Sequence, residues 1–239
     1  MPLAFLSLCL TLLGCQAPVD GAPAEPARIL FLGNSFTYVN DLPAMVAAVT
    51  EQAGVPRPVT AMVAQPNASL EDLMAEGSAR ARLQASRWDF VVLQQGPSTQ
   101  PDSRVHLIEW TRQWAPLIRQ AGAEPVLYMV WPGVERVAAT EDARVNYRDA
   151  ARAVAGRFAP VGAGWRLALT AAPNPGVASG DGFHPSVAGT YLAAVVLVAV
   201  MTGADPAMLP AAVPGHPEIG AAAARQLQQV ARQVLAAER

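Results

Sequence analysis

The chain contains the stretch Ile29-Leu30-Phe31-Leu32-Gly33-Asn34-Ser35, in which four consecutive apolar residues end at a glycine. A short, continuous apolar run of this kind is typical of a strand that is buried on both faces, as in a parallel sheet. Gly33 permits a tight turn directly after such a strand. The stretch therefore predicts a first buried strand with Ser35 at its carboxyl end.

The rest of the chain repeats this alternation of strand and helix patterns. Strand patterns lie at residues 59–64, 88–93 and 125–131, with a short candidate at 160–162. Helical patterns lie at residues 41–53, 70–85, 102–120, 141–158, 186–201 and 219–237. Strands that alternate with helices indicate a parallel sheet with helices on both faces. The predicted fold class is α/β, a three-layer α/β/α sandwich around a parallel sheet of four or five strands.

The composition excludes several classes of protein. The chain has 239 residues, 52% of them hydrophobic and 15% charged, with a net charge of −2. A chain this apolar can bury a core, which excludes wholesale disorder. The near-neutral balance, without a basic run, argues against a nucleic-acid partner. The length predicts one main domain of about 200 residues.

The first residues have the pattern of a targeting signal. Residues 1–13 are apolar or uncharged, and they are too few to span a bilayer. The following Leu12-Leu13-Gly14-Cys15 resembles a bacterial lipobox, whose cysteine is lipidated and becomes the mature N-terminus. We predict a lipoprotein signal peptide over residues 1–14 and lipidation at Cys15. An ordinary secretory signal with an incidental cysteine is the alternative.

The segment after the signal predicts where the mature chain resides. Residues 15–27 are rich in Pro and Ala and predict a tether, followed by a domain over residues 28–239. The lipid would be the only contact with a membrane. The protein is then exported and anchored in the cell envelope, and Gln16 after Cys15 favours the outer membrane. Loss of Cys9 with the signal and lipidation of Cys15 exclude cysteine catalysis.

A second polar segment, Asp181-Gly182-Phe183-His184, lies directly before a predicted helix. A histidine can act as general base for a serine, while a carboxylate fixes its tautomer and stabilises the imidazolium. Ser35 would be a nucleophile if such a base lies near it. The alternatives are that Ser35 only begins a turn and that Asp181 only caps the following helix.

A metal site is not expected. Such a site needs three or four ligands, and no spacing groups the three histidines His106, His184 and His216. Glycine-rich nucleotide-binding motifs do not occur in the sequence. We therefore predict no cofactor.

The stretch 29–35 and the segment 181–185 together resemble the SGNH hydrolase superfamily, the GDSL-type esterases, over about residues 28–204. The resemblance implies a flavodoxin-like sandwich. It also implies that Ser35 is the nucleophile, that His184 is the general base and then the acid, and that Asp181 is the orienting carboxylate. Asn34 stands where the family usually has an aspartate.

The resemblance also implies an oxyanion hole, and here the sequence departs from the family. The family uses the serine amide, a glycine amide after the second strand and an asparagine side chain after the third. In this chain the corresponding donors would be Ser35, Asn67 and Gln94, with Gln95 as the second choice for the last. Asn67 tolerates the left-handed backbone that glycine provides. The two glutamines alternatively only satisfy the loop at the strand end.

Two aromatic regions have open interpretations. His106 and Trp110 are four residues apart in a predicted helix, which favours packing or a surface position for His106. Trp131 follows the fourth predicted strand, where it either lines a substrate pocket or packs in the core.

The resemblance implies a serine hydrolase that cleaves a carboxylic ester through an acyl-enzyme. Its substrate would be a small-molecule or glycan ester, such as an acylated carbohydrate. One alternative is a non-catalytic envelope lipoprotein that keeps the fold and binds a glycan or a partner. Another is a lipase or lysophospholipase, which would share the chemistry and differ in the pocket.

Overall fold

The computed structural model describes residues 25–239 and shows one parallel sheet of five strands. The strands are β1 (Arg28–Gly33), β2 (Val59–Ala64), β3 (Phe90–Leu93), β4 (Glu124–Tyr128) and β5 (Arg157–Ala159). Their order across the sheet is β2-β1-β3-β4-β5, which is the flavodoxin-like order. The predicted fold class is confirmed.

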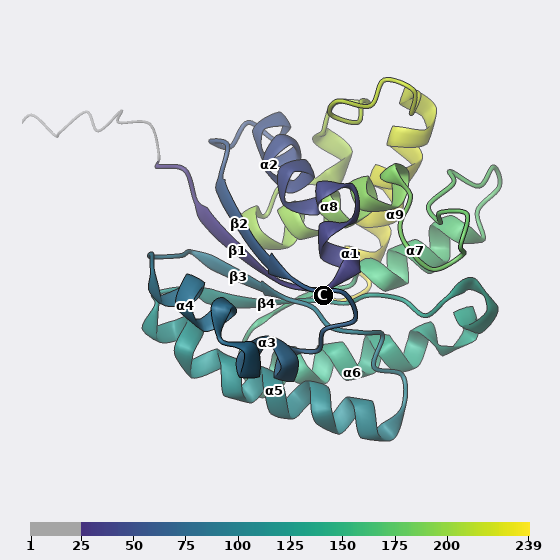
Figure 1. Ribbon diagram of the computed structural model, residues 1–239. Coiled ribbons are helices and arrows are strands. Elements are labelled where there is room, and N and C mark those ends of the chain that lie inside the picture. Colours follow the sequence, from purple (N-terminus) through teal and green to yellow (C-terminus); the bar gives the residue numbers. More distant parts are fainter. Residues whose placement is uncertain (1–24) are drawn as a thin grey trace, which may run out of the picture.

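Helices cover both faces of the sheet (Figure 1). One layer contains α2 (Leu42–Gln52), α7 (Val161–Leu169), α8 (Val187–Thr202) and α9 (Ala221–Ala236). The other contains α3 (Leu70–Glu76), α4 (Ser78–Gln84), α5 (Pro101–Gln120) and α6 (Thr140–Ala153). The shorter helices are α1 (Ser35–Tyr38) and the 3-10 turns η1 (Val39–Asp41), η2 (Val134–Ala139) and η3 (Pro206–Met208).

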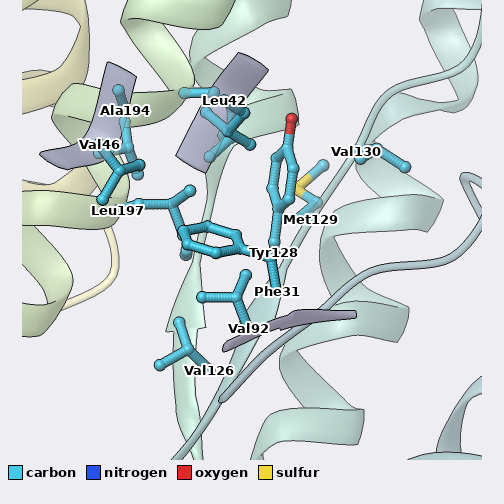
Figure 2. Close-up of a cluster of buried hydrophobic side chains, with 14 of the residues drawn as sticks. Phe31, Leu42, Val46, Val92, Val126, Tyr128, Met129, Val130, Ala194 and Leu197 are labelled. Atoms are coloured by element: carbon cyan, nitrogen blue, oxygen red, sulfur yellow. The ribbon is translucent and has the colours of Figure 1, made fainter. Parts of the chain in front are cut away.

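The core lies between the sheet and these helices, and α8 is its central helix. Twelve of the 16 residues of α8 are buried, because α2, α7, α9 and β5 all pack against it. Figure 2 shows the meeting of sheet side chains (Phe31, Val92, Val126, Tyr128) with side chains of α2 (Leu42, Val46) and α8 (Ala194, Leu197). Within residues 25–239, no helix combines the length and apolarity that a membrane span requires.

The structure corrects two predicted helices. The helix predicted at 70–85 is two helices, because Gly77 adopts a left-handed conformation with φ of 90° between them. The helix predicted at 141–158 ends at Ala153, and Arg157–Ala159 form strand β5 instead. The strand predicted at 160–162 is wrong as well, since these residues lead into and begin α7.

The predicted signal peptide (1–14), the lipidation site at Cys15 and most of the tether (15–27) lie outside the described residues. These assignments stay predictions. The first strand begins at Arg28.

Candidate active site

Ser35 lies at the topological switch point of the sheet. Strands β1 and β3 are neighbours that pair Leu32 with Leu93, while the connections from their carboxyl ends lead to opposite faces. Ligands of open parallel sheets bind in the crevice outside such a point. Ser35 is the first residue of α1, directly after β1, and is partly exposed there.

Gly33 allows the turn before Ser35 to pack against β3. A Cβ atom at Gly33 would lie 2.3 Å from Thr37 Oγ1 and 2.4 Å from Gln94 Oε1. These two oxygens are themselves joined, since the Thr37 hydroxyl donates to Gln94 Oε1 over 2.8 Å. Thr37 and Gln94 are both buried, so neither side chain has room to move away from a Cβ atom at Gly33.

Asn34 and Gln94 form a two-way amide bridge between the ends of β1 and β3. The Asn34 backbone N–H donates to Gln94 Oε1 over 2.9 Å, and Gln94 Nε2 donates to Asn34 Oδ1 over 2.8 Å. Asn34 Nδ2 also donates to the Ala68 carbonyl over 3.0 Å. Asparagine at this position thus adds a donor that an aspartate lacks, and the donor ties the Ser35 turn to the loop after β2.

This bridge contradicts the prediction that Gln94 donates to the oxyanion. The second hydrogen on Gln94 Nε2 goes to the Gln95 carbonyl over 2.6 Å, and the side chain is fully buried. Both amide hydrogens are therefore used inside the fold. Gln94 positions the Ser35 turn and does not face the cavity beside it.

The second choice, Gln95, does face that cavity. Its Oε1 accepts from the Leu70 backbone N–H over 3.3 Å, and its Nε2 donates to Ser98 Oγ over 3.0 Å. One hydrogen of Nε2 thus remains without a partner among the described residues. Asn67 lines the same cavity, and its φ of 59° is the left-handed conformation expected for it.

The structure brings Asp181 and His184 to Ser35. His184 Nε2 lies 2.9 Å from Ser35 Oγ, and His184 Nδ1 lies 2.6 Å from Asp181 Oδ2. Asp181 Oδ1 accepts from the backbone N–H groups of Phe183 and His184, each over 2.9 Å. The hydroxyl of Ser179, which the sequence did not single out, donates to the same oxygen over 2.6 Å.

These hydrogen bonds keep Asp181 ionised. The Ser179 hydroxyl, the His184 ring and the two backbone N–H groups together hold the pKa of Asp181 well below its usual range. The carboxylate therefore stays charged through the mildly acidic range and accepts the Nδ1–H of His184. This arrangement leaves Nε2 to accept the proton of Ser35.

Aromatic packing holds the His184 loop against the Ser35 helix. Phe36 makes edge contacts with Trp131 and Phe183, with ring centroids 5.1 and 4.8 Å apart. Trp131 Nε1 donates to the Phe183 carbonyl over 3.0 Å. Trp131 is fully buried, so packing is its role and it does not line the cavity.

Asn40 makes two side-chain hydrogen bonds near the site that the sequence did not predict. Its side-chain Nδ2 donates to the Pro185 carbonyl and to Thr190 Oγ1, each over 3.0 Å. Asn40 has a left-handed φ of 55°, which asparagine adopts more readily than most residues. It links the segment after Ser35 to the loop that carries His184.

The cavity beside Ser35 has a volume of about 340 Å³. The side chains that line it include hydroxyls and amides but none of Asp, Glu, Lys or Arg. The lining residues are Asn34, Ser35, Phe36, Asn67, Ala68, Ser69, Gln95, Gly96, Pro97, Ser98, Ser103, His106 and Phe183. His106 was expected to pack or to lie on the surface, and its place in this lining had no signal in the sequence. Within the described part of the chain, no group of three or more His, Cys, Asp or Glu residues is placed to hold a metal ion.

The fold is shared with solved structures, several of which are named as hydrolases. A candidate SGNH hydrolase from Slackia heliotrinireducens is 27% identical with a TM-score of 0.64, and the match covers 74% of this chain and 100% of that one. A DUF4886 family protein from Bacteroides uniformis is 17% identical with a TM-score of 0.68, over 89% and 95% of the two chains.

An acetyl xylan esterase variant from Geobacillus stearothermophilus is 19% identical with a TM-score of 0.56, over 74% of this chain and 94% of that one. No protein-family model and no curated protein matches the sequence. The strand order and the similarity to these structures show that the chain has the fold of the SGNH hydrolases, and they support its place there as a divergent member.

Proposed function

We propose that the protein is a serine esterase that removes a short acyl group from a hydroxyl-rich alcohol. The observation that carries the proposal is the continuous line of hydrogen bonds from Ser35 Oγ through the His184 ring to Asp181. The line lies at the switch point of the sheet, beside a cavity. Nucleophile, base and orienting carboxylate are the three parts that acyl transfer by a serine requires.

In the proposed reaction, Ser35 Oγ attacks the ester carbonyl while His184 Nε2 takes its proton. The developing oxyanion is held by the backbone N–H groups of Ser35 and Asn67, neither of which donates to another described residue, and by Gln95 Nε2. The alcohol leaves with the proton from His184, which gives an acyl-enzyme. Water then repeats the two steps and releases the acid.

The lining of the cavity supports an acylated carbohydrate as the substrate. None of Asp, Glu, Lys or Arg lines the cavity, which suits a neutral alcohol such as a sugar, and the structural neighbours include variants of one acetyl xylan esterase. A lipase would need an aliphatic channel for a long chain, and no Leu, Ile, Val or Met lines this cavity.

A fluorophosphonate probe on the purified domain, residues 28–239, tests whether Ser35 is activated. We expect the wild-type domain to be labelled and the Ser35→Ala variant to remain unlabelled, because the probe reacts only with a serine whose proton a base removes. A folded wild-type domain without label would overturn the proposal and favour the non-catalytic reading, which glycan-binding assays would then test.

The Gln95→Glu variant tests the assignment of the third oxyanion donor. The carboxylate keeps an oxygen for the Leu70 backbone N–H but removes both amide hydrogens. We expect kcat for 4-nitrophenyl acetate to fall about 10²- to 10³-fold, as when one oxyanion donor is lost. An unchanged melting temperature would show that the fold is intact. A kcat within threefold of wild type would assign the donor elsewhere.

A further inference from the structure

A histidine other than His184, His106, lines the cavity beside Ser35. His106 lies on α5, one turn after Ser103, which lines the same cavity. Its Nε2 lies 2.9 Å from Glu71 Oε2 of α3, and its side chain is 32% exposed. The contact with Glu71 fixes the orientation of the ring at the edge of the cavity.

This contact also decides which ring nitrogen is available. A carboxylate accepts hydrogen bonds, so Nε2 must carry the hydrogen that Glu71 receives. In a neutral imidazole the other nitrogen, Nδ1, then has a free lone pair. No residue within 25–239 makes a hydrogen bond to Nδ1.

The serine hydroxyls of the same lining each donate one hydrogen bond and accept another inside the fold. Ser69 donates to Asp72 Oδ2, Ser98 to the Gly96 carbonyl and Ser103 to the Gln100 carbonyl. Their oxygens accept from the Asp72 backbone N–H, from Gln95 Nε2 and from the Gln100 backbone N–H, respectively. On the α5 side of the cavity, His106 Nδ1 is therefore the side-chain acceptor that receives no hydrogen bond from the described residues, whereas Ser103 Oγ already makes two.

We propose that His106 is a specificity-determining residue, whose Nδ1 accepts a hydrogen bond from a hydroxyl of the sugar in the ester's alcohol portion. An acetyl group has no hydrogen-bond donor, so the acyl portion of the ester gains nothing from this nitrogen. The inference rests on the proposed esterase function and adds to it the residue that distinguishes a sugar ester from a simple ester.

The test compares two substrates that carry the same acyl group. Acetylated xylobiose offers hydroxyl groups in its alcohol portion, and 4-nitrophenyl acetate offers none. For the His106→Phe variant we expect kcat/KM for acetylated xylobiose to fall about tenfold more than kcat/KM for 4-nitrophenyl acetate, mainly through KM. One lost hydrogen bond at a partly buried site accounts for this size of change. His106→Asn, whose amide places a polar atom near the position of Nδ1, should recover part of the preference.

His216→Phe is the matched control. His216 also pairs with a carboxylate, Glu218 at 2.9 Å, but lies outside the cavity lining. Its substitution should therefore leave kcat/KM unchanged for both substrates. Equal losses on both substrates in His106→Phe, or no loss on either, would overturn the inference while the esterase proposal stands. If the wild type hydrolyses neither ester and takes no fluorophosphonate label, the proposed function itself fails.

Discussion

The His184→Ala variant is expected to lose ester hydrolysis by a factor of about 10⁴ to 10⁶ in kcat. Its ring is the group within 2.9 Å of Ser35 Oγ, so removing it leaves the hydroxyl with its proton and with ordinary, weak nucleophilicity. In serine hydrolases, loss of the base alone costs nearly as much as loss of the whole catalytic unit. Initial rates with 4-nitrophenyl acetate measure the effect, and fluorophosphonate labelling should disappear with it.

The control for this variant is His216→Ala, which removes a histidine of similar exposure that also pairs with a carboxylate. Its rate should equal that of the wild type, and both variants should melt near the wild-type temperature because neither ring belongs to the core. A His184→Ala variant that keeps a tenth of the wild-type rate would show that another group removes the proton from Ser35.

The Gly33→Ala variant is expected to lose both stability and activity. The added methyl group would lie 2.3 and 2.4 Å from two buried oxygens that are hydrogen-bonded to each other, so the turn and the end of β3 must separate. Overpacking of this kind costs about 1–3 kcal/mol, and broken buried hydrogen bonds add to the cost. We expect the free energy of unfolding to fall by about 2–4 kcal/mol in urea. The rate of the protein that remains folded should fall about 100-fold, because Ser35 moves with the turn.

Gly180→Ala is a suitable comparison, because an added methyl group there meets no atom within 4 Å although the next residue is Asp181. Its free energy of unfolding should lie within about 0.5 kcal/mol of the wild type. A Gly33→Ala variant with wild-type stability and rate would show that the turn adapts, and the close approach at Gly33 would not be needed.

The sequence predicts the strands that are continuous apolar runs but not the last one. Strand β5 has three residues, Arg157–Ala159, and lies at the edge of the sheet, so no buried run marks it. The helix before it ends where Ala155 takes a left-handed φ of 47°. That position usually belongs to glycine, so the glycine that marks the end of many helices is displaced here by one residue, to Gly156.

The prediction of the candidate site from the sequence has a similar limit. Ser35, Asp181 and His184 were identified because short motifs carry them, and motifs fix spacing along the chain. The choice between Gln94 and Gln95 depends instead on the side to which each side chain points at a strand end, and neighbours in an extended segment point to opposite sides. Only the hydrogen bonds of the fold decide that question. His106 and Ser179 were missed because their roles come from partners and a cavity brought together by folding.

The hydrogen bonds that hold the Ser35 turn in place come from groups that stay neutral near neutral pH. The bridge of Asn34 and Gln94 is made of neutral amides, where an aspartate would titrate. Tyr128, which donates to the Phe36 carbonyl, and Tyr147, which donates to the Gln95 carbonyl, have pKa values raised by burial. The hydrogen bonds that hold the Ser35 turn therefore keep the same donors and acceptors in acid and in mild alkali, so the turn itself does not depend on pH over that range.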